Sequence, residues 1–275
     1  MSEKTFFTQY STNKSPIKIH CISQYIKEQE KALASIPEIP FSKVWVASQL
    51  LPKIPANSFI HFSILGSFRA SNFFQLPESV QSSCNVGGFG IDGATSTVLG
   101  ASLINKEKLH YLMTGDLAFF YDLNAIGNRH LSNNVRILLV NNGNGTEFRM
   151  HWHPCSAFTK DECDKYMAAG GHYGNKSSKF VRHMAEDLGF EYLCASTKEE
   201  FNSVLPRFTE LTCTPKPILL EVFTDSETDS NVVDQMRHLL KDSGYAARKG
   251  KQKIKETIKT IIGDKTYDLL KQKLN

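Results

Sequence analysis

"TGDLAFFYDLNAIGNRHLSNNVRILLVNNGNGTEF", residues 114–148, is the stretch that decides the fold. It begins where an apolar run ends in Gly115-Asp116, and its own apolar run, "VRILLV" at 135–140, continues directly into Asn-Asn-Gly-Asn-Gly. The segment "AFFYDLNAIGN" between them predicts a helix, so the stretch indicates a strand–helix–strand unit. Buried polar groups need partners, so two carboxamides at the end of an apolar strand predict a polar site there.

The same alternation continues on both sides of this stretch. Apolar segments predict strands at 58–64, 109–114, 135–140, 191–195 and 217–223. Segments with helical character predict helices at 42–51, 92–104, 118–128, 179–188, 198–208 and 230–240, the first with Ser42 as N-cap. Apolar strands that alternate with helices indicate an α/β fold: a doubly wound, mainly parallel sheet with helices on both faces.

The length of 275 residues allows one sizeable domain with appendages. We expect residues 1–40 to be a linker or the remnant of a preceding domain, and residues 41–243 to form the α/β domain. Residues 244–275 contain nine Lys or Arg and three acidic residues, so the net charge of this tail is +6. Since the whole chain has a net charge of +4, the remaining residues have a net charge of −2. The basic character belongs to the tail, and we expect no nucleic-acid partner.

The tail also has a helical pattern, with isoleucines on one face and lysines opposite: Ile254, Ile258, Ile261 and Ile262. This predicts a basic amphipathic helix. Two interpretations stay open with equal weight. The helix folds back on the domain, or residues 248–275 attach to an anionic membrane surface or an acidic partner.

Composition indicates an ordinary soluble globular protein, with 41% hydrophobic and 22% charged residues. The longest apolar runs are too short to cross a bilayer, and the first residues lack the pattern of a signal peptide. The six cysteines are scattered without CxxC pairs, which favours free thiols. We therefore expect a cytoplasmic protein, with membrane association only through the tail.

Polar residues at the two strand ends predict a cation site. Ligands of parallel sheets bind beyond the carboxyl ends of the strands, where Asp116 and Asn142 both fall, 26 residues apart. A carboxylate, a carboxamide and loop carbonyls are hard oxygen donors that suit Mg²⁺. Alone, Asp116 would be read as a helix cap and the asparagines as a turn, but their joint spacing favours binding.

Two other metal or cofactor motifs are weaker. Gly88, Gly90 and Gly93 have the G-x-G-x-x-G spacing of a dinucleotide loop, but the acidic residue about twenty positions later is missing. "HWHPC" at 151–155, followed by Cys163, lacks the spacing of a common zinc site. We expect a loop over the site entrance there. For His172, a role at the site and a satisfied loop residue stay open with equal weight.

Gly115-Asp116 through Asn141-Asn142 resembles the GD…NN signature of thiamine-diphosphate enzymes. Together with "NVGGFGIDGATSTVLG" at 85–100, the stretch looks most like the 2-succinyl-5-enolpyruvyl-6-hydroxy-3-cyclohexene-1-carboxylate synthases of menaquinone biosynthesis. The resemblance covers roughly residues 41–240 and corresponds to the C-terminal, diphosphate-binding domain of that family. It implies thiamine diphosphate and Mg²⁺ as cofactors, and a transferase or lyase acting on a 2-oxo acid.

The resemblance also implies a set of site residues. Asp116 and Asn142 would ligate Mg²⁺ through their side chains, and Asn144 through its backbone carbonyl. Ile91 would hold the cofactor in its bent conformation. The full set of implied cofactor-binding residues is Ser67, Gly88, Gly90, Ile91, Gly115, Asp116, Leu117, Asn142 and Asn144. No catalytic residue is assigned.

Departures from the family pattern limit the expected reaction. Val86 and Ser71 stand where the synthases carry arginines that pair with substrate carboxylates, and Arg69 is displaced from the second position by two. The pattern supports decarboxylation of a 2-oxo acid, with or without transfer to an acceptor, but not the menaquinone reaction itself.

The family also uses a glutamate from a separate pyrimidine-binding domain, which residues 1–40 are too short to form. We therefore expect a partner domain or subunit, in a homo- or hetero-oligomer, and a chain that is inactive alone. The alternative is a non-catalytic binding or scaffold protein that retains the fold.

Overall fold

A computed structural model of the chain describes residues 33–239, apart from Phe89 and residues 173–175, and a few positions between 23 and 31. One compact unit runs from Glu38 to Met236, and the remaining residues at both ends fall in a second unit. No helix among the described residues is long and apolar enough to cross a membrane. The predicted tail helix at 244–275 lies outside the described residues, and the domain boundaries at 40 and 243 stay predictions.

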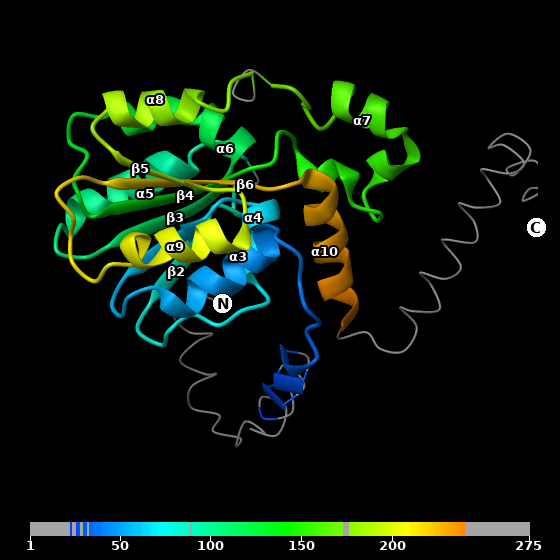
Figure 1. Cartoon of the computed structure of the whole chain (residues 1–275), viewed down its shortest axis with the longest axis horizontal. Coiled ribbons are helices and arrows are strands. Elements are labelled where there is room, and N and C mark those ends of the chain that lie inside the picture. The colour runs from blue at the N-terminus through cyan, green and yellow to red at the C-terminus, as the bar shows by residue number, and fades with distance from the viewer. Residues whose placement is uncertain are drawn as a thin grey trace, which may run out of the picture. The chain divides into compact units, whose positions relative to one another are not determined.

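The described residues of the compact unit form one parallel sheet in the order β2-β1-β3-β4-β6-β5 (Figure 1). The strands are β1 (Phe59–Phe62), β2 (Gln81–Cys84), β3 (His110–Gly115), β4 (Val135–Asn141), β5 (Glu191–Ala195) and β6 (Ile218–Phe223). β3 and β4 are in register from His110↔Val135 to Gly115↔Val140, so their last residues lie at one level. Both are almost entirely buried, as their continuous apolar sequence predicts.

Helices cover both faces of this sheet (Figure 1). The helices within residues 42–239 are α3 (Lys43–Leu50), α4 (Gly66–Ser71), α5 (Ala94–Ile104), α6 (Asp116–Tyr121), α7 (Lys160–Tyr166), α8 (Phe180–Asp187), α9 (Lys198–Phe208) and α10 (Ser226–Leu239). Four 3-10 turns are η1 (Leu51–Lys53), η2 (Leu123–Gly127), η3 (Thr146–Arg149) and η4 (Pro154–Ala157). The predicted doubly wound α/β fold is confirmed.

Side-chain packing holds each layer of helices to the sheet. On one face, α5, α6 and α8 enclose a cluster of buried residues with the strands, including Val98, Phe119, Val181 and Leu139. On the other, α3 packs against α9 through an edge-on contact of Trp45 and Phe201, with ring centroids 5.6 Å apart. The start of α3 is fixed as predicted, because the Ser42 hydroxyl accepts the Trp45 N–H at 3.3 Å.

Several elements differ from the sequence prediction: α4 and α7 were not predicted, α10 begins at Ser226 instead of residue 230, and two further differences concern β2 and α6. β2 was not predicted, because "QSSC" is polar and lies at the exposed edge of the sheet, where no apolar pattern is required. The predicted helix over 118–128 is two pieces, α6 and η2. The chain leaves helical geometry at Asp122, whose carboxylate accepts both the backbone N–H and the hydroxyl of Ser96, at 2.6 and 2.9 Å.

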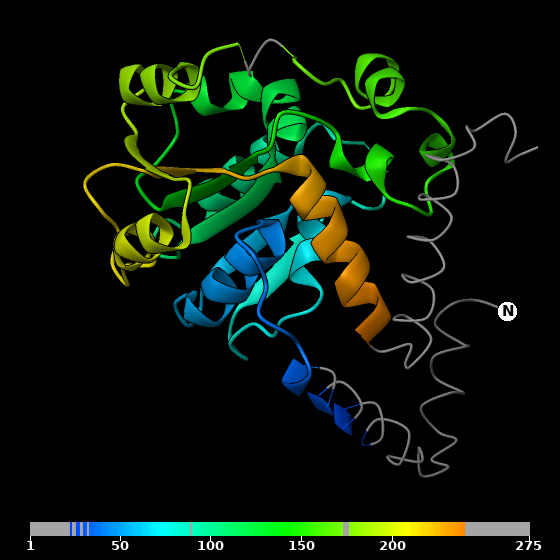
Figure 2. The same cartoon turned by 45° about the vertical axis from the view of Figure 1, so that its right-hand side comes forward.

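The strand order creates a switch point between β1 and β3. From β1 the chain crosses first to β2 on one side and then to β3 on the other, so the loops after these strands diverge. All six strands are parallel, and their carboxyl ends therefore share one edge of the sheet (Figure 2). This carboxyl edge is where a ligand is expected.

Phe119 gives a direct test of the α6 face of the core. Its ring is completely buried, whereas Tyr121 on the same helix is 70% exposed. Phe119→Ala should reduce the free energy of unfolding by about 3–5 kcal/mol in urea denaturation, because a buried ring leaves a cavity. Tyr121→Ala, the matched control, should change it by less than about 0.5 kcal/mol. Equal effects of the two variants would contradict the described packing.

Candidate cofactor site

Asp116 joins the ends of β3 and β4. Its carboxylate is buried, and Oδ2 accepts the Gly143 backbone N–H at 2.7 Å. The other oxygen, Oδ1, accepts the Leu117 N–H at 2.9 Å. Gly143 has a φ of +83°, a left-handed conformation in which glycine is favoured, and this turn directs its N–H toward the aspartate. The predicted proximity of Asp116 and the Asn-Asn-Gly turn is confirmed.

Asn142 is oriented by two acceptors on its amide nitrogen. Nδ2 donates to the Thr146 hydroxyl at 2.7 Å and to Asp229 Oδ2 at 2.9 Å. The amide oxygen is therefore turned away from both partners, and it accepts only a long bond of 3.4 Å from the Asn144 N–H. Since the amide is fixed by its nitrogen, the oxygen keeps capacity for a further partner.

Asn144 is buried in the turn after Asn142. Its backbone carbonyl accepts the Thr146 N–H at 3.0 Å, and its side-chain nitrogen donates to the Ser226 hydroxyl at 3.2 Å. The side-chain oxygen is buried and has no hydrogen-bond partner among the described residues. Buried polar atoms are normally paired, so an orphan acceptor here is a sign of a site built for another group.

Asn141, the first of the two adjacent asparagines, has a different role. Its amide nitrogen donates to Glu221 Oε1 at 2.8 Å, and the Tyr192 hydroxyl donates to Oε2 at 2.7 Å. Glu221 is 1% exposed, and burial raises the pKa of its carboxyl while these two hydrogen bonds oppose the rise. The two adjacent asparagines therefore have different roles. Asn141 donates a hydrogen bond to the buried Glu221 side chain, whereas the Asn142 side chain lies at the carboxyl edge of the sheet.

Asp229 connects β6 to this turn and was not predicted. It is completely buried and accepts three hydrogen bonds, from the Asn142 amide, from the Thr224 hydroxyl at 2.7 Å and from the Lys43 backbone N–H at 2.6 Å. The signal was present, because Asp229 shortly follows a strand end as Asp116 does. It was missed because α10 was expected to begin only at 230.

Three charged side chains lie around Asp229 and Asp116. Lys43 is buried, and burial lowers the pKa of its ammonium group while the charges of Asp229, Glu147 and Asp116 oppose the change. Arg69 forms an ion pair of 3.0 Å with Glu147. Lys43 and Glu147 were not identified from the sequence, because nothing in their local pattern distinguishes them.

The glycine-rich segment after β2 is tied to β1 by Asn85. The Asn85 amide nitrogen donates to the Gly90 carbonyl at 2.6 Å, and its oxygen accepts the Ile64 N–H at 2.8 Å. Ile91 is partly exposed and Gly88 is exposed. Within the described residues no hydrogen bond links this segment to Asp116, and its predicted contribution to cofactor binding stays a prediction.

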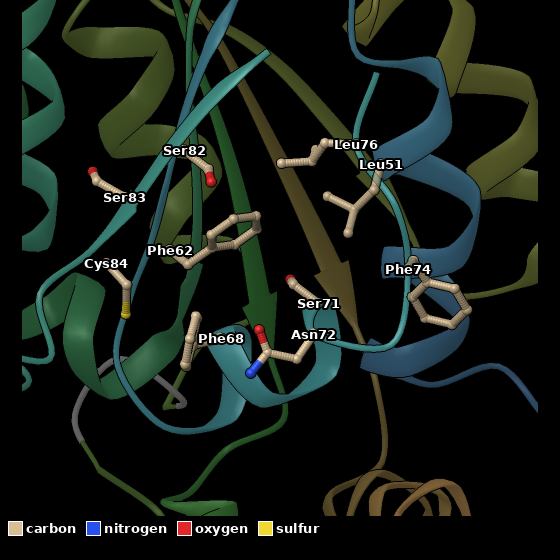
Figure 3. Close-up of a pocket in the computed structure, with 10 residues that line it drawn as sticks. All are labelled: Leu51, Phe62, Phe68, Ser71, Asn72, Phe74, Leu76, Ser82, Ser83 and Cys84. Carbon is tan, nitrogen blue, oxygen red and sulfur yellow. The ribbon is translucent and has the colours of Figure 1, made fainter. Parts of the chain in front are cut away.

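Ser67 is buried at the start of α4. Phe68 and Ser71 of the same helix line a cavity of about 360 Å³ (Figure 3). The lining residues are Leu51, Phe62, Phe68, Ser71, Asn72, Phe74, Leu76, Ser82, Ser83 and Cys84. None of these ten carries a charge. Ser71, which stands at an expected arginine position, therefore lines an uncharged cavity.

The "HWHPC" loop is held by local contacts. Arg149 pairs with Asp164 and donates to the Ser226 hydroxyl at 2.7 Å, and His153 Nδ1 accepts the Cys155 N–H at 3.2 Å. No group of three or more His, Cys, Asp or Glu side chains suited to a metal occurs in the described part of the chain. The five cysteines in that part are free thiols.

His172 lies in direct contact with Asp116. Its Nε2 is 3.0 Å from Asp116 Oδ2, and both side chains are buried. The sequence left its role open, because "GGHYGN" carries no periodic pattern. Its position is a consequence of the long segment after β4 returning to the carboxyl edge.

The fold is that of a doubly wound α/β domain with an all-parallel sheet, consistent with the thiamine-diphosphate-binding fold. Comparison with known proteins gives the particular relatives. The 2-succinyl-5-enolpyruvyl-6-hydroxy-3-cyclohexene-1-carboxylate synthase of Bacteroides fragilis is 32% identical over 206 residues, 75% of this chain and 35% of the relative. The synthase of Bacteroides thetaiotaomicron is 30% identical over 82% of this chain and 40% of its own length.

The synthase of the same name from Christiangramia forsetii is 32% identical over 78% of this chain and 35% of its own length. No protein-family model matches the chain. The resemblance predicted from the sequence is confirmed: relatives about 30% identical over 75–82% of this chain carry the name of that synthase. It spans only between about a third and two fifths of the length of these relatives.

The buried Glu221 predicts a pH-dependent stability difference. A folded-state pKa above the ordinary 4.5 means that the native protein keeps a proton which the unfolded chain releases. The stability that Glu221 provides is therefore present below about pH 4.5 and is lost as the pH rises through the raised pKa.

Relative to Glu221→Gln, the wild type should lose free energy of unfolding with increasing pH, by at most about 1.4 kcal/mol per pH unit. Urea denaturation of both proteins between pH 4 and 8 measures this difference. A difference that does not change with pH would contradict a raised pKa.

Proposed function

We propose that the domain binds Mg²⁺ and the diphosphate of thiamine diphosphate at the carboxyl edge. The ligands to Mg²⁺ would be the side chains of Asp116 and Asn142 and the backbone carbonyl of Asn144. The observation that carries this proposal is the Gly143 N–H bond to Asp116, which brings oxygen donors from two strands together.

The donor set fits the cation. Asp116 Oδ1 accepts one hydrogen bond, the Asn142 amide oxygen accepts one long bond, and the Asn144 carbonyl accepts one. Each of these oxygens therefore keeps a lone pair. Mg²⁺ prefers oxygen ligands and commonly completes its shell with phosphate oxygens and water, which leaves room for the diphosphate.

The remaining cofactor contacts belong to the same proposal. Ile91 would support the bent cofactor from the glycine-rich segment, whose conformation depends on Asn85. The other proposed contacts are Ser67, Gly88, Gly90, Gly115 and Leu117. When bound, thiamine diphosphate supplies an electron sink for the decarboxylation of a 2-oxo acid. This chain's residues would hold the diphosphate and orient the cofactor.

We propose the activity of a 2-oxo acid decarboxylase or synthase component, hence a transferase or lyase. The names of the relatives support a synthase, although the chain covers 35–40% of their length. Recognition of substrate carboxylates would differ from that expected for the synthases. Ser71 lines an uncharged cavity, and Arg69 forms an ion pair with Glu147.

A pyrimidine-binding domain or subunit would complete the site. The family resemblance places the activating glutamate in that domain. Val86 is 45% exposed and Ile91 is partly exposed beside it, and apolar groups at the surface around a site favour a covering partner. The resulting assembly would be a homo- or hetero-oligomer.

Asp116→Ala tests cofactor binding. The variant should lose Mg²⁺-dependent binding of thiamine diphosphate in calorimetry, because it removes the carboxylate at the centre of the site. Circular dichroism should show an intact fold. Asp187→Ala, at the exposed end of α8, is the matched control and should bind like the wild type. Unchanged binding by Asp116→Ala would disprove the assignment.

The isolated chain should be catalytically silent. General acid–base assistance is typically worth about 10²–10⁴ in rate, and the chain alone would lack it together with the enclosing wall. Purified protein with thiamine diphosphate, Mg²⁺ and a panel of 2-oxo acids should release no CO₂ above background. Activity should appear when a pyrimidine-binding subunit is added.

Robust turnover by the chain alone would show that a base within residues 1–275 replaces the family's glutamate. Cofactor binding without turnover, even with the added subunit, would instead favour a non-catalytic binding protein that retains the fold.

A further inference from the structure

We infer that His172 is a positioning residue, which holds Asp116 in the orientation required for cation binding. The inference rests on the proposed function, because it concerns the same metal site. Its basis is a hydrogen bond between two buried side chains that come from segments 56 residues apart in the chain.

The geometry assigns the direction of this bond. A carboxylate only accepts hydrogen bonds, so Nε2 of His172 carries the proton and donates to Asp116 Oδ2 across 3.0 Å. The exposed fractions of the two side chains are 9% and 4%. Water therefore competes little with the imidazole for this oxygen.

The two oxygens of the Asp116 carboxylate have different hydrogen-bond donors. Oδ2 accepts from both Gly143 N–H and His172, whereas Oδ1 accepts only from the N–H of the next residue, Leu117. With two donors on Oδ2, the carboxylate cannot rotate without losing both bonds. Oδ1 is then the oxygen with a lone pair free for a cation.

The imidazole is itself held in place. Its ring lies 5.4 Å from the ring of Phe120, at an interplanar angle of 55°. The preceding loop is tied to the metal-binding turn, because Gly145 N–H donates to the Ala168 carbonyl at 2.6 Å. The loop that carries His172 and the turn that carries Asn144 are therefore joined by a backbone hydrogen bond.

The second ring nitrogen supports a specific role for the bond. Nδ1 is buried and has no hydrogen-bond partner among the described residues. Within those residues, the only polar bond of the ring is the one to Asp116. A side chain needed only for packing on Phe120 would not require a nitrogen at all.

Four variants of the full chain separate positioning from packing. His172→Gln can place an amide N–H near the Nε2 position, whereas the shorter side chain of His172→Asn cannot reach it. His172→Phe keeps the ring contact with Phe120 and removes the bond. His130→Phe is the matched control, since His130 is exposed in the loop before β4, at the opposite edge of the sheet.

The readout is Mn²⁺ binding in the presence of thiamine diphosphate, from the electron paramagnetic resonance signal of free Mn²⁺ at one fixed pH. His172→Phe and His172→Asn should bind Mn²⁺ about 10–100-fold more weakly, the usual effect of losing a partner of a metal ligand. His172→Gln and His130→Phe should bind like the wild type. Without metal, circular dichroism should show that all four keep the wild-type fold at the temperature of the binding measurement.

The outcomes are distinct. Wild-type affinity in His172→Asn and His172→Phe would overturn the inference and leave the proposed metal site intact. Equally weak binding by His172→Gln and His172→Asn would also overturn it, because the restored N–H would then have no effect. If His172→Phe fails to fold, the Gln and Asn pair decides alone. No Mn²⁺ binding by the wild type would reject the proposed function and the inference with it.

Discussion

The hydrogen bond from the Gly143 backbone to Asp116 is the constraint on which the carboxyl edge depends. It joins the ends of two adjacent parallel strands whose register already places them at one level. A buried carboxylate requires donors, and the glycine turn supplies one that no side chain has to provide. Because the turn is fixed in this way, the amide of Asn142 and the carbonyl of Asn144 are fixed beside Asp116.

Hydrogen bonds of two further buried acidic residues, Asp229 and Glu221, stabilise the Asn141-Asn142 turn. Asp229 links the end of β6, the start of α3 and the amide of Asn142 through three hydrogen bonds. The Glu221 carboxyl group, on β6, likewise accepts hydrogen bonds from the Asn141 amide and the Tyr192 hydroxyl. The edge of the sheet is therefore a connected polar network, and such networks orient groups well only when nearly every member has a partner. Among the described residues, the Asn144 side-chain oxygen and His172 Nδ1 are two buried atoms without a partner, and both lie at the proposed site.

The similarity to the synthases is stronger in the proposed cofactor site than in the residues expected to recognise the substrate. The Asp116 carboxylate and the Asn-Asn-Gly turn of the GD…NN pair are joined by a hydrogen bond. The arginines expected for substrate acids are absent, and Arg69 is paired with Glu147. Retention of one half of a site with change in the other is typical of a fold that hosts several reactions.

The sequence by itself determined the parallel α/β sheet and the pairing of Asp116 with the Asn-Asn-Gly turn. Both depend on local patterns: apolar runs that form buried strands, and polar residues at their ends. β2 could not be predicted, because an exposed edge strand needs no apolar residues. Lys43 and His172 could not be predicted either, since their roles come from contacts between segments far apart in the chain, whereas Asp229 was missed although it follows a strand end. Only the tertiary structure, by returning the loop before α8 to the carboxyl edge, placed a histidine against Asp116.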